Sequence, residues 1–179
     1  GILQFSSTNF AAGEGAGVAT ITVVRTGGAL GTVSVPFSTA GISATAGSDF
    51  TPTNGILTFN NGVTSRSFTV PLIDDLANEV NETIALNLGT PTGTTLGSAN
   101  AATLTIQDND LPPTLGIEPL ANQILLSWPT QAASFLLESA PLISGATWTS
   151  VTNLPAVVGN QFVVTNSVGT SNQFYRLRR

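Results

Sequence analysis

Short apolar stretches separated by turn residues are the feature that most constrains the fold of this chain. Segments such as Ser67–Ile73 alternate apolar and polar residues, and pairs such as Gly27-Gly28, Asn54-Gly55 and Asn61-Gly62 stand between segments. A period of two is the pattern of a β-strand with one buried face, and these pairs are typical of tight turns. A chain built this way folds as a β-sandwich or barrel, so we expect an all-β protein.

The strands fall into two sets. In residues 1–110 we expect seven strands that form an antiparallel sandwich, at about 2–10, 18–26, 32–39, 55–59, 65–73, 83–90 and 100–107. In residues 114–179 we expect a second, smaller β-sandwich with strands at about 123–128, 135–139, 148–151, 161–165 and 174–179.

The charge changes between the two sets. By formal count residues 1–110 carry −8 + 2 = −6, and residues 111–179 carry −2 + 3 = +1. Leu111-Pro112-Pro113 lies at that change, and Pro-Pro favours a stiff, extended segment. The sequence therefore predicts two domains, 1–110 and 114–179, joined by a linker at 111–113.

Three absent residue types narrow the chemistry. The sequence has no Cys, no His and no Lys, which excludes disulfides and thiolate metal sites, the commonest general base, and Schiff-base catalysis. The net charge of −5 argues against nucleic acid and anionic membranes as partners, and no apolar run is long enough for a bilayer. The chain starts at Gly1 directly in strand-like sequence, so we expect a processed product or a fragment.

Strand order predicts where the acidic side chains lie. If each strand reverses the direction of the one before, then the connections after the first, third and fifth strands share one end with the exit of the seventh. The opposite connections, Gly27–Gly31, Asn60–Thr64 and Pro91–Ala99, hold no acid. The shared end holds every acid of the first domain, namely Glu14, Asp49, Asp74, Asp75, Glu79, Glu82, Asp108 and Asp110.

Carboxylates that converge in this way repel one another unless a cation neutralises them. Ca²⁺ takes six to eight oxygen ligands in a tolerant geometry, whereas zinc and copper sites rely on His or Cys. The interpretation is therefore a calcium site. The alternatives are solvated loop acids and a paired-carboxylate glycosidase, but among the acidic motifs Phe50 is the only aromatic residue. We expect no enzymatic activity.

Five blocks of the first domain, in the same order, resemble the Calx-beta domain of sodium–calcium exchangers, integrin β4 and large bacterial surface proteins. The blocks are Ala46–Pro52, Gly55–Phe59, Val70–Asp75, Glu79–Thr83 and Leu104–Asp110. The resemblance implies a seven-stranded immunoglobulin-like sandwich that binds calcium.

By motif, the resemblance carries the metal ligands over to the eight acids named above, with a backbone carbonyl from Ala77. Asn109 stands where the strongest calcium binders have an acid, and Leu76 interrupts a run that is often acidic. We therefore expect fewer ions or weaker binding than in the exchanger's sensor.

In the second domain, Leu126-Ser127-Trp128-Pro129 at the start and Phe174-Tyr175-Arg176-Leu177-Arg178 at the end resemble a reduced fibronectin type III-like domain found at the C-terminal ends of secreted bacterial proteins. We expect Trp128, Trp148 and Tyr175 in its core rather than on a sugar-binding surface. The basic end, with Arg176, Arg178 and Arg179, is expected to be solvated, the alternatives being an anionic partner surface and an export-recognition role. Such a domain is expected to have one more strand than the sequence predicts here. A missing strand would leave a sheet edge open for strand addition by another subunit.

Together these features predict a calcium-binding structural or adhesive module of an extracellular or cell-surface bacterial protein. Calcium would stiffen the loops and the interdomain junction, and the partners would be cell-surface components or other copies of the chain assembled into fibres. The alternatives are a calcium sensor and an accessory module of a larger secreted enzyme.

Overall fold

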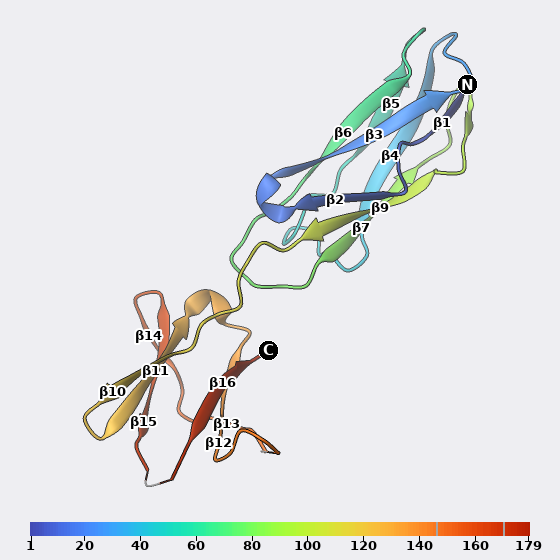
Figure 1. The fold of residues 1–179 in the computed structure, drawn as a ribbon. Helices are drawn as coiled ribbons and strands as arrows, with labels where there is room; N and C mark the ends of the chain where they lie inside the picture. Colours follow the sequence, from blue (N-terminus) through green and yellow to red (C-terminus); the bar gives the residue numbers. More distant parts are fainter. Residues whose placement is uncertain (146, 170) are drawn as a thin grey trace. The chain divides into compact units, whose positions relative to one another are not determined.

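The computed structural model describes residues 1–145, 147–169 and 171–179. The chain divides into two compact units, of which the first contains Gly1–Asp75 and Glu79–Asn109, and the second contains Leu76–Asn78 and Asp110–Arg179. Within the described residues the elements are β-strands and two short 3₁₀ helices, η1 (Glu14–Ala16) and η2 (Thr130–Ala132) (Figure 1). The predicted all-β class is confirmed.

The first unit consists of two sheets. One has the strand order β6 (Ser65–Pro71), β3 (Val18–Thr26), β1 (Ile2–Phe5) and β8 (Thr95–Leu96). The other has the order β2 (Asn9–Gly13), β9 (Ala101–Gln107), β7 (Glu82–Leu88), β4 (Val33–Gly41) and β5 (Asn54–Phe59). This is the immunoglobulin-like sandwich that the sequence predicts.

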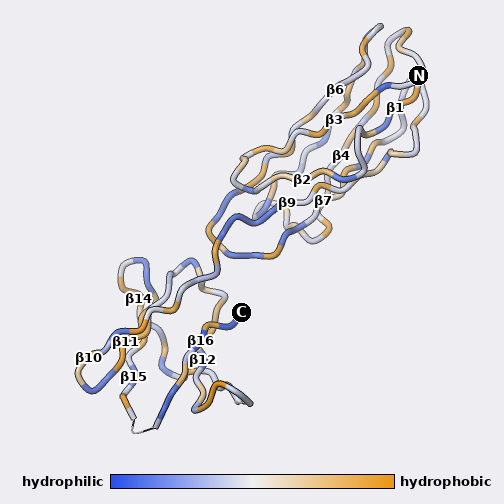
Figure 2. The backbone as a smooth tube through the Cα atoms, in the orientation of Figure 1, coloured by the Kyte–Doolittle hydropathy of each residue, from blue (hydrophilic) through white to orange (hydrophobic). Residues whose placement is uncertain are grey.

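Alternating residues of both sheets form one apolar core. Ile21 and Val23 of β3 and Ile84 and Leu86 of β7 are each 0% exposed, while the residues between them face outward. Figure 2 shows this alternation as orange segments along the strands. Burying a side chain of this size contributes about 1.5–3 kcal/mol, so the sandwich holds its connections at fixed positions.

The expected first strand, 2–10, is two strands in different sheets. Between them Ser7 Oγ donates to the Asn9 carbonyl (2.8 Å) and accepts from the Asn9 amide (3.1 Å). Such local bonds compete with ladder bonds, and the chain crosses from one sheet to the other here. In consequence β1 pairs in parallel with β8, and β2 with β9; the other strand pairs of the unit are antiparallel, as expected.

The second unit also has two sheets. One has the order β10 (Gly116–Leu120), β11 (Gln123–Pro129), β15 (Gln161–Ser167) and β14 (Ala156–Val158). The other has the order β13 (Thr149–Ser150), β12 (Leu136–Ala140) and β16 (Phe174–Arg178). β10 and β14 were not predicted, because their residues are mostly exposed and lack a clear alternation.

The core of the second unit is small. Leu126 and Trp128 of β11 pack with Leu137 of β12 and Val164 of β15, and Tyr175 packs against them. Trp148 is only partly buried and is not among the residues of this cluster, contrary to expectation. The guanidinium carbon of Arg176 lies 4.2 Å from its ring centroid in a cation–π contact. No helix in the described part of the chain is long and apolar enough to cross a membrane.

Candidate metal centre

Asp49 is positioned by its neighbour Phe50, which is fully buried in the sandwich core. The Asp49 amide donates to the Thr45 carbonyl (3.0 Å), and the Asp49 side chain accepts from the Thr45 amide. The amide of Ile73 donates to the Asp49 carbonyl (3.0 Å). The β4–β5 connection is therefore fixed against the end of β6, where the next acids begin.

Glu79 and Glu82 are held by bonds between two connections. Asp108 Oδ1 accepts from the Glu79 amide (3.1 Å), and the Asp108 amide donates to Asn81 Oδ1 (3.2 Å). Glu82 is the first residue of β7, so the core strand fixes its backbone. The β6–β7 connection and the residues that follow β9 are thus held together by hydrogen bonds.

These anchors bring a group of carboxylates together. Oxygens of Asp49, Glu79 and Glu82 all lie within 4.8 Å of one another, and all three residues are partly buried. We call these three residues the carboxylate cluster. The cluster borders a cavity of about 10 Å³, which has room for about one water-sized sphere. The lining residues are Glu14, Asp49, Glu79, Val80, Glu82, Ile106 and Asp108.

Glu14 belongs to η1, which Figure 1 places at the end of the first unit away from the N-terminus. The Gly17 amide donates to the Glu14 carbonyl (3.2 Å), and the Leu72 amide donates to the Gly17 carbonyl (2.9 Å). These bonds join η1 to the end of β6. Carboxylate oxygens of Glu14 and Asp75 consequently lie within 4.8 Å of each other.

Asp74 is bound by Asn109, whose Nδ2 donates to Asp74 Oδ1 (3.1 Å). Gly15 makes room for this pair, because a Cβ atom at Gly15 would lie 2.7 Å from Asn109 Nδ2. The side-chain amide of Asn109 thus hydrogen-bonds one carboxylate oxygen of Asp74, which the sequence predicts as a metal ligand.

Neither arginine of the first unit belongs to the cluster. Arg25 is buried, and its guanidinium donates to carbonyls of residues 29–31 at 2.7–3.2 Å. Arg66 Nε donates to the Thr58 carbonyl (3.1 Å). Three carboxylates at close range with both arginines engaged elsewhere have the chemistry of a hard-cation site: oxygen donors, negative charge and partial shielding from water.

A family model for the Calx-beta domain matches residues 1–110. The chain belongs to the Calx-beta family. All of the first unit, including the carboxylate cluster, lies in the matched region.

Known proteins with similar sequence contain this Calx-beta domain as a small part. The chain is 35% identical to the zebrafish (Danio rerio) adhesion G-protein coupled receptor V1 over 132 residues, which is 72% of this chain and 2% of the receptor. It is 38% identical to human sodium/calcium exchanger 3 over 92 residues, 51% of this chain and 10% of the exchanger. The chain therefore spans a small fraction of these relatives.

Solved structures agree with the fold. The apo-form Calx CBD1 domain has a TM-score of 0.58 and 31% identity, and the match covers 60% of this chain and 96% of that one. The calcium binding domain CBD12 of CALX1.1 has a TM-score of 0.60 at 20% identity, covering 98% of this chain and 74% of that one. At 20% identity the second match supports the fold alone.

Two of the expected ligands lie in the second unit. Ala77 is in the segment Leu76–Asn78, and Asp110 is at the start of the unit's main segment. There Asn78 Nδ2 donates to the Asp110 carbonyl (2.7 Å). The role of Ala77 and Asp110 as calcium ligands stays a prediction.

Sequence reasoning missed the residues that orient the acids. The backbone of Thr45 donates to the side chain of Asp49 and accepts from its amide. The side chain of Asn81 accepts from the Asp108 amide. For Asp49 a signal existed, since an Asp after Gly-Ser commonly bonds a nearby backbone amide in a turn. Asn81 gave no such signal, because its partner Asp108 is 27 residues away.

Proposed function

We propose that the first unit is a calcium-binding module and that the carboxylate cluster holds an ion, with Glu14 and Asp108 beside it. One observation carries the proposal: two connections that are far apart in sequence place oxygens of three carboxylates within 4.8 Å of one another. Without a cation, each pair repels. An ion would convert this repulsion into a bond between the β4–β5 and β6–β7 connections.

Calcium suits this site better than other metals. The donors are carboxylate oxygens, and Ca²⁺ accepts six to eight oxygens at 2.3–2.6 Å in variable geometry. Mg²⁺ requires a near-ideal octahedron and retains several waters. The name of one relative agrees, since it is a sodium/calcium exchanger.

The remaining acids support a second ion in this proposal. Glu14 and Asp75 lie within 4.8 Å of each other, and Asp74 is bound to Asn109. Asp110 and the Ala77 carbonyl complete the set that the family motif implies. An amide at Asn109 supplies less charge than a carboxylate, so this second ion would be bound more weakly than the first.

The proposed role is structural or adhesive, outside the cell or at its surface, and without catalysis. The chain has no Cys, so metal ions replace disulfides as a brace. The second unit would be a fibronectin type III-like domain, and calcium near Asp110 would stiffen the Leu111-Pro112-Pro113 junction. The name of the zebrafish relative, an adhesion receptor, is consistent with this role.

Calorimetric titration tests the proposal. Wild-type protein should bind Ca²⁺ with a dissociation constant of about 0.1–1 mM, the range of extracellular modules, and Mg²⁺ more weakly. The triple variant Asp49→Asn, Glu79→Gln, Glu82→Gln should lose this binding, while Glu118→Gln, a control at an exposed glutamate of the second unit, should retain it. Equal calcium binding by wild type and triple variant would refute the site.

Scattering in solution separates the structural role from the sensor alternative. A brace should reduce interdomain flexibility at millimolar calcium with little change inside the first unit. A sensor should respond at micromolar calcium with a large change of shape.

A further inference from the structure

The second unit has a free strand edge at β16. In its sheet β16 pairs with β12 on one side only. Within the described residues, no backbone bond joins Phe174–Arg178 to any other strand. A row of unpaired amides and carbonyls of this kind is a template for an additional strand.

An apolar groove runs beside this edge. Leu115, just before β10, and Ile117 of β10 line it together with Leu126 of β11, Phe174 and Tyr175 of β16, and one polar residue, Gln173. Its volume is about 330 Å³. Side chains that displaced water from this groove would bury apolar surface, which favours an apolar occupant.

The occupant would pair with β16 rather than with β10. β10 contains Pro119, which has no amide hydrogen and interrupts a ladder. β16 contains neither Pro nor Gly. In β16 Tyr175 and Leu177 pack against the core cluster, so an added strand would direct every second residue toward the groove.

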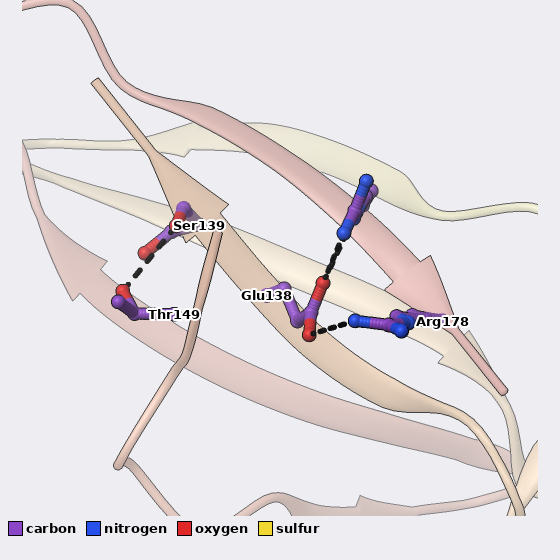
Figure 3. Close-up of polar contacts among 5 residues, drawn as sticks. Glu138, Ser139, Thr149 and Arg178 are labelled. Carbon is purple, nitrogen blue, oxygen red and sulfur yellow. Dashed lines mark hydrogen bonds and ion pairs between the residues drawn. The ribbon is translucent and has the colours of Figure 1, made fainter. Parts of the chain in front are cut away.

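The outer face of β16 carries an excess of positive charge. Arg176 Nη2 lies 2.7 Å from Glu138 Oε2, and Arg178 Nη1 lies 3.6 Å from Glu138 Oε1 (Figure 3). One carboxylate thus serves two guanidinium groups, and the Arg178 side chain remains 65% exposed. Opposite charges on neighbouring strands stabilise a pair by about 0.2–1 kcal/mol, so carboxylates suit the outward positions of an added strand.

We propose that this groove binds an extended acidic segment of a partner protein by strand addition to β16. Alternate apolar residues of the segment fill the groove, and the Asp or Glu residues between them lie beside Arg176 and Arg178. The backbone bonds to β16 supply affinity, while the groove and the arginines supply specificity. This interaction is independent of the proposed calcium site.

A labelled ten-residue peptide that alternates Val and Glu is the probe for fluorescence anisotropy with the whole chain. It should bind, and should bind at least about tenfold more tightly than a Val/Lys peptide or a Val/Glu peptide interrupted by a central proline, a difference of about 1.4 kcal/mol. No binding, or equal binding of the three peptides, would overturn the proposal.

Paired variants locate the binding. Ile117 and Val157 are both exposed strand residues of the same sheet, at 58% and 63%, but only Ile117 lines the groove. Ile117→Glu should weaken peptide binding about tenfold or more, and Val157→Glu should leave it unchanged, with melting curves confirming that both fold. Equal effects of the two variants would overturn the assignment.

A charge reversal keeps the proposal testable if Ile117→Glu does not fold. Arg178→Glu should weaken binding of the Val/Glu peptide and strengthen binding of the Val/Lys peptide, because the charge next to the added strand changes sign. Unchanged preference would contradict the proposal. Dimerisation of the wild-type chain that Ile117→Glu abolishes would assign the groove to a second copy and overturn the acidic partner.

Discussion

Neutralising one carboxylate of the cluster should stabilise the calcium-free protein and reduce the stabilisation that calcium gives. Glu82→Gln keeps the size and shape of the side chain and removes one charge. If the cluster is a metal site, this charge is unfavourable in the empty site and favourable in the occupied one. Solvated loop acids would show no such reversal.

The effect without calcium follows from the geometry. Two carboxylates within 4.8 Å repel by at least about 0.9 kcal/mol in water and about 3.5 kcal/mol at an effective dielectric constant of 20. Glu82 takes part in two such pairs, and partial exposure favours the lower value. Glu82→Gln should therefore stabilise the calcium-free first unit by about 1–2 kcal/mol, or roughly 4–16 °C in Tm.

The effect with calcium follows from linkage. At 10 mM Ca²⁺, a dissociation constant of about 0.1–1 mM stabilises the folded state by roughly 1.4–2.7 kcal/mol. A variant that binds at least tenfold more weakly loses at least about 1.0–1.3 kcal/mol of this gain. The calcium-induced rise in Tm should be about 6–20 °C for wild type and at most about half of that for Glu82→Gln.

Differential scanning calorimetry in EDTA and in 10 mM Ca²⁺ measures both effects, with Glu118→Gln as the matched control. The expected outcome is that Glu82→Gln melts above wild type in EDTA and gains much less than wild type from calcium. If wild type and Glu82→Gln gain equally from calcium, or if wild type gains nothing, the assignment of the cluster to a metal is wrong.

Three further results are expected. Mg²⁺ should raise the Tm of the first unit by less than half of the rise that Ca²⁺ gives at equal concentration, because Mg²⁺ dehydrates reluctantly. Equal Tm shifts in calorimetry would contradict a calcium preference. Asn109→Asp removes the hydrogen bond to Asp74 and adds a charge, so it should lower the Tm in EDTA. It should also tighten calcium binding about threefold to tenfold in a titration. Weaker binding would exclude position 109 as a ligand. Glu138→Gln leaves Arg176 without its carboxylate partner, so it should destabilise the second unit by about 1–2 kcal/mol in urea unfolding without shifting the transition of the first unit.

The fold of the first unit could be predicted because its core strands alternate cleanly. Segments such as Ser67–Ile73 and Ile84–Leu88 have the period of two that a half-buried strand requires. The division of the first strand was not predictable from periodicity, because β1 and β2 differ in the sheet that they join, which a period of two does not report. The two-residue strand β8 was missed because Thr95–Leu96 is too short to show a period.

Strand order placed the acidic connections at one end, and the family motif named the same residues. What neither could supply was the grouping of Asp49 with Glu79 and Glu82, and of Glu14 with Asp75. That grouping depends on hydrogen bonds between distant connections, such as the Ile73 amide to the Asp49 carbonyl. The ion pairs of Arg176 and Arg178 were missed for the same reason, since Glu138 lies on a different strand.

The bonds between the β6–β7 connection and Asp108 have a consequence for the lifetime of the protein. This connection includes no strand residues between Leu72 and Asn81 in the described chain, and Val80 is 78% exposed. Proteases cleave segments that open locally. Under the proposed function, calcium depletion would release the carboxylates and open this connection first. Extracellular calcium would then set how quickly the protein is degraded, and a fall in calcium would mark existing molecules for removal without any change in their synthesis.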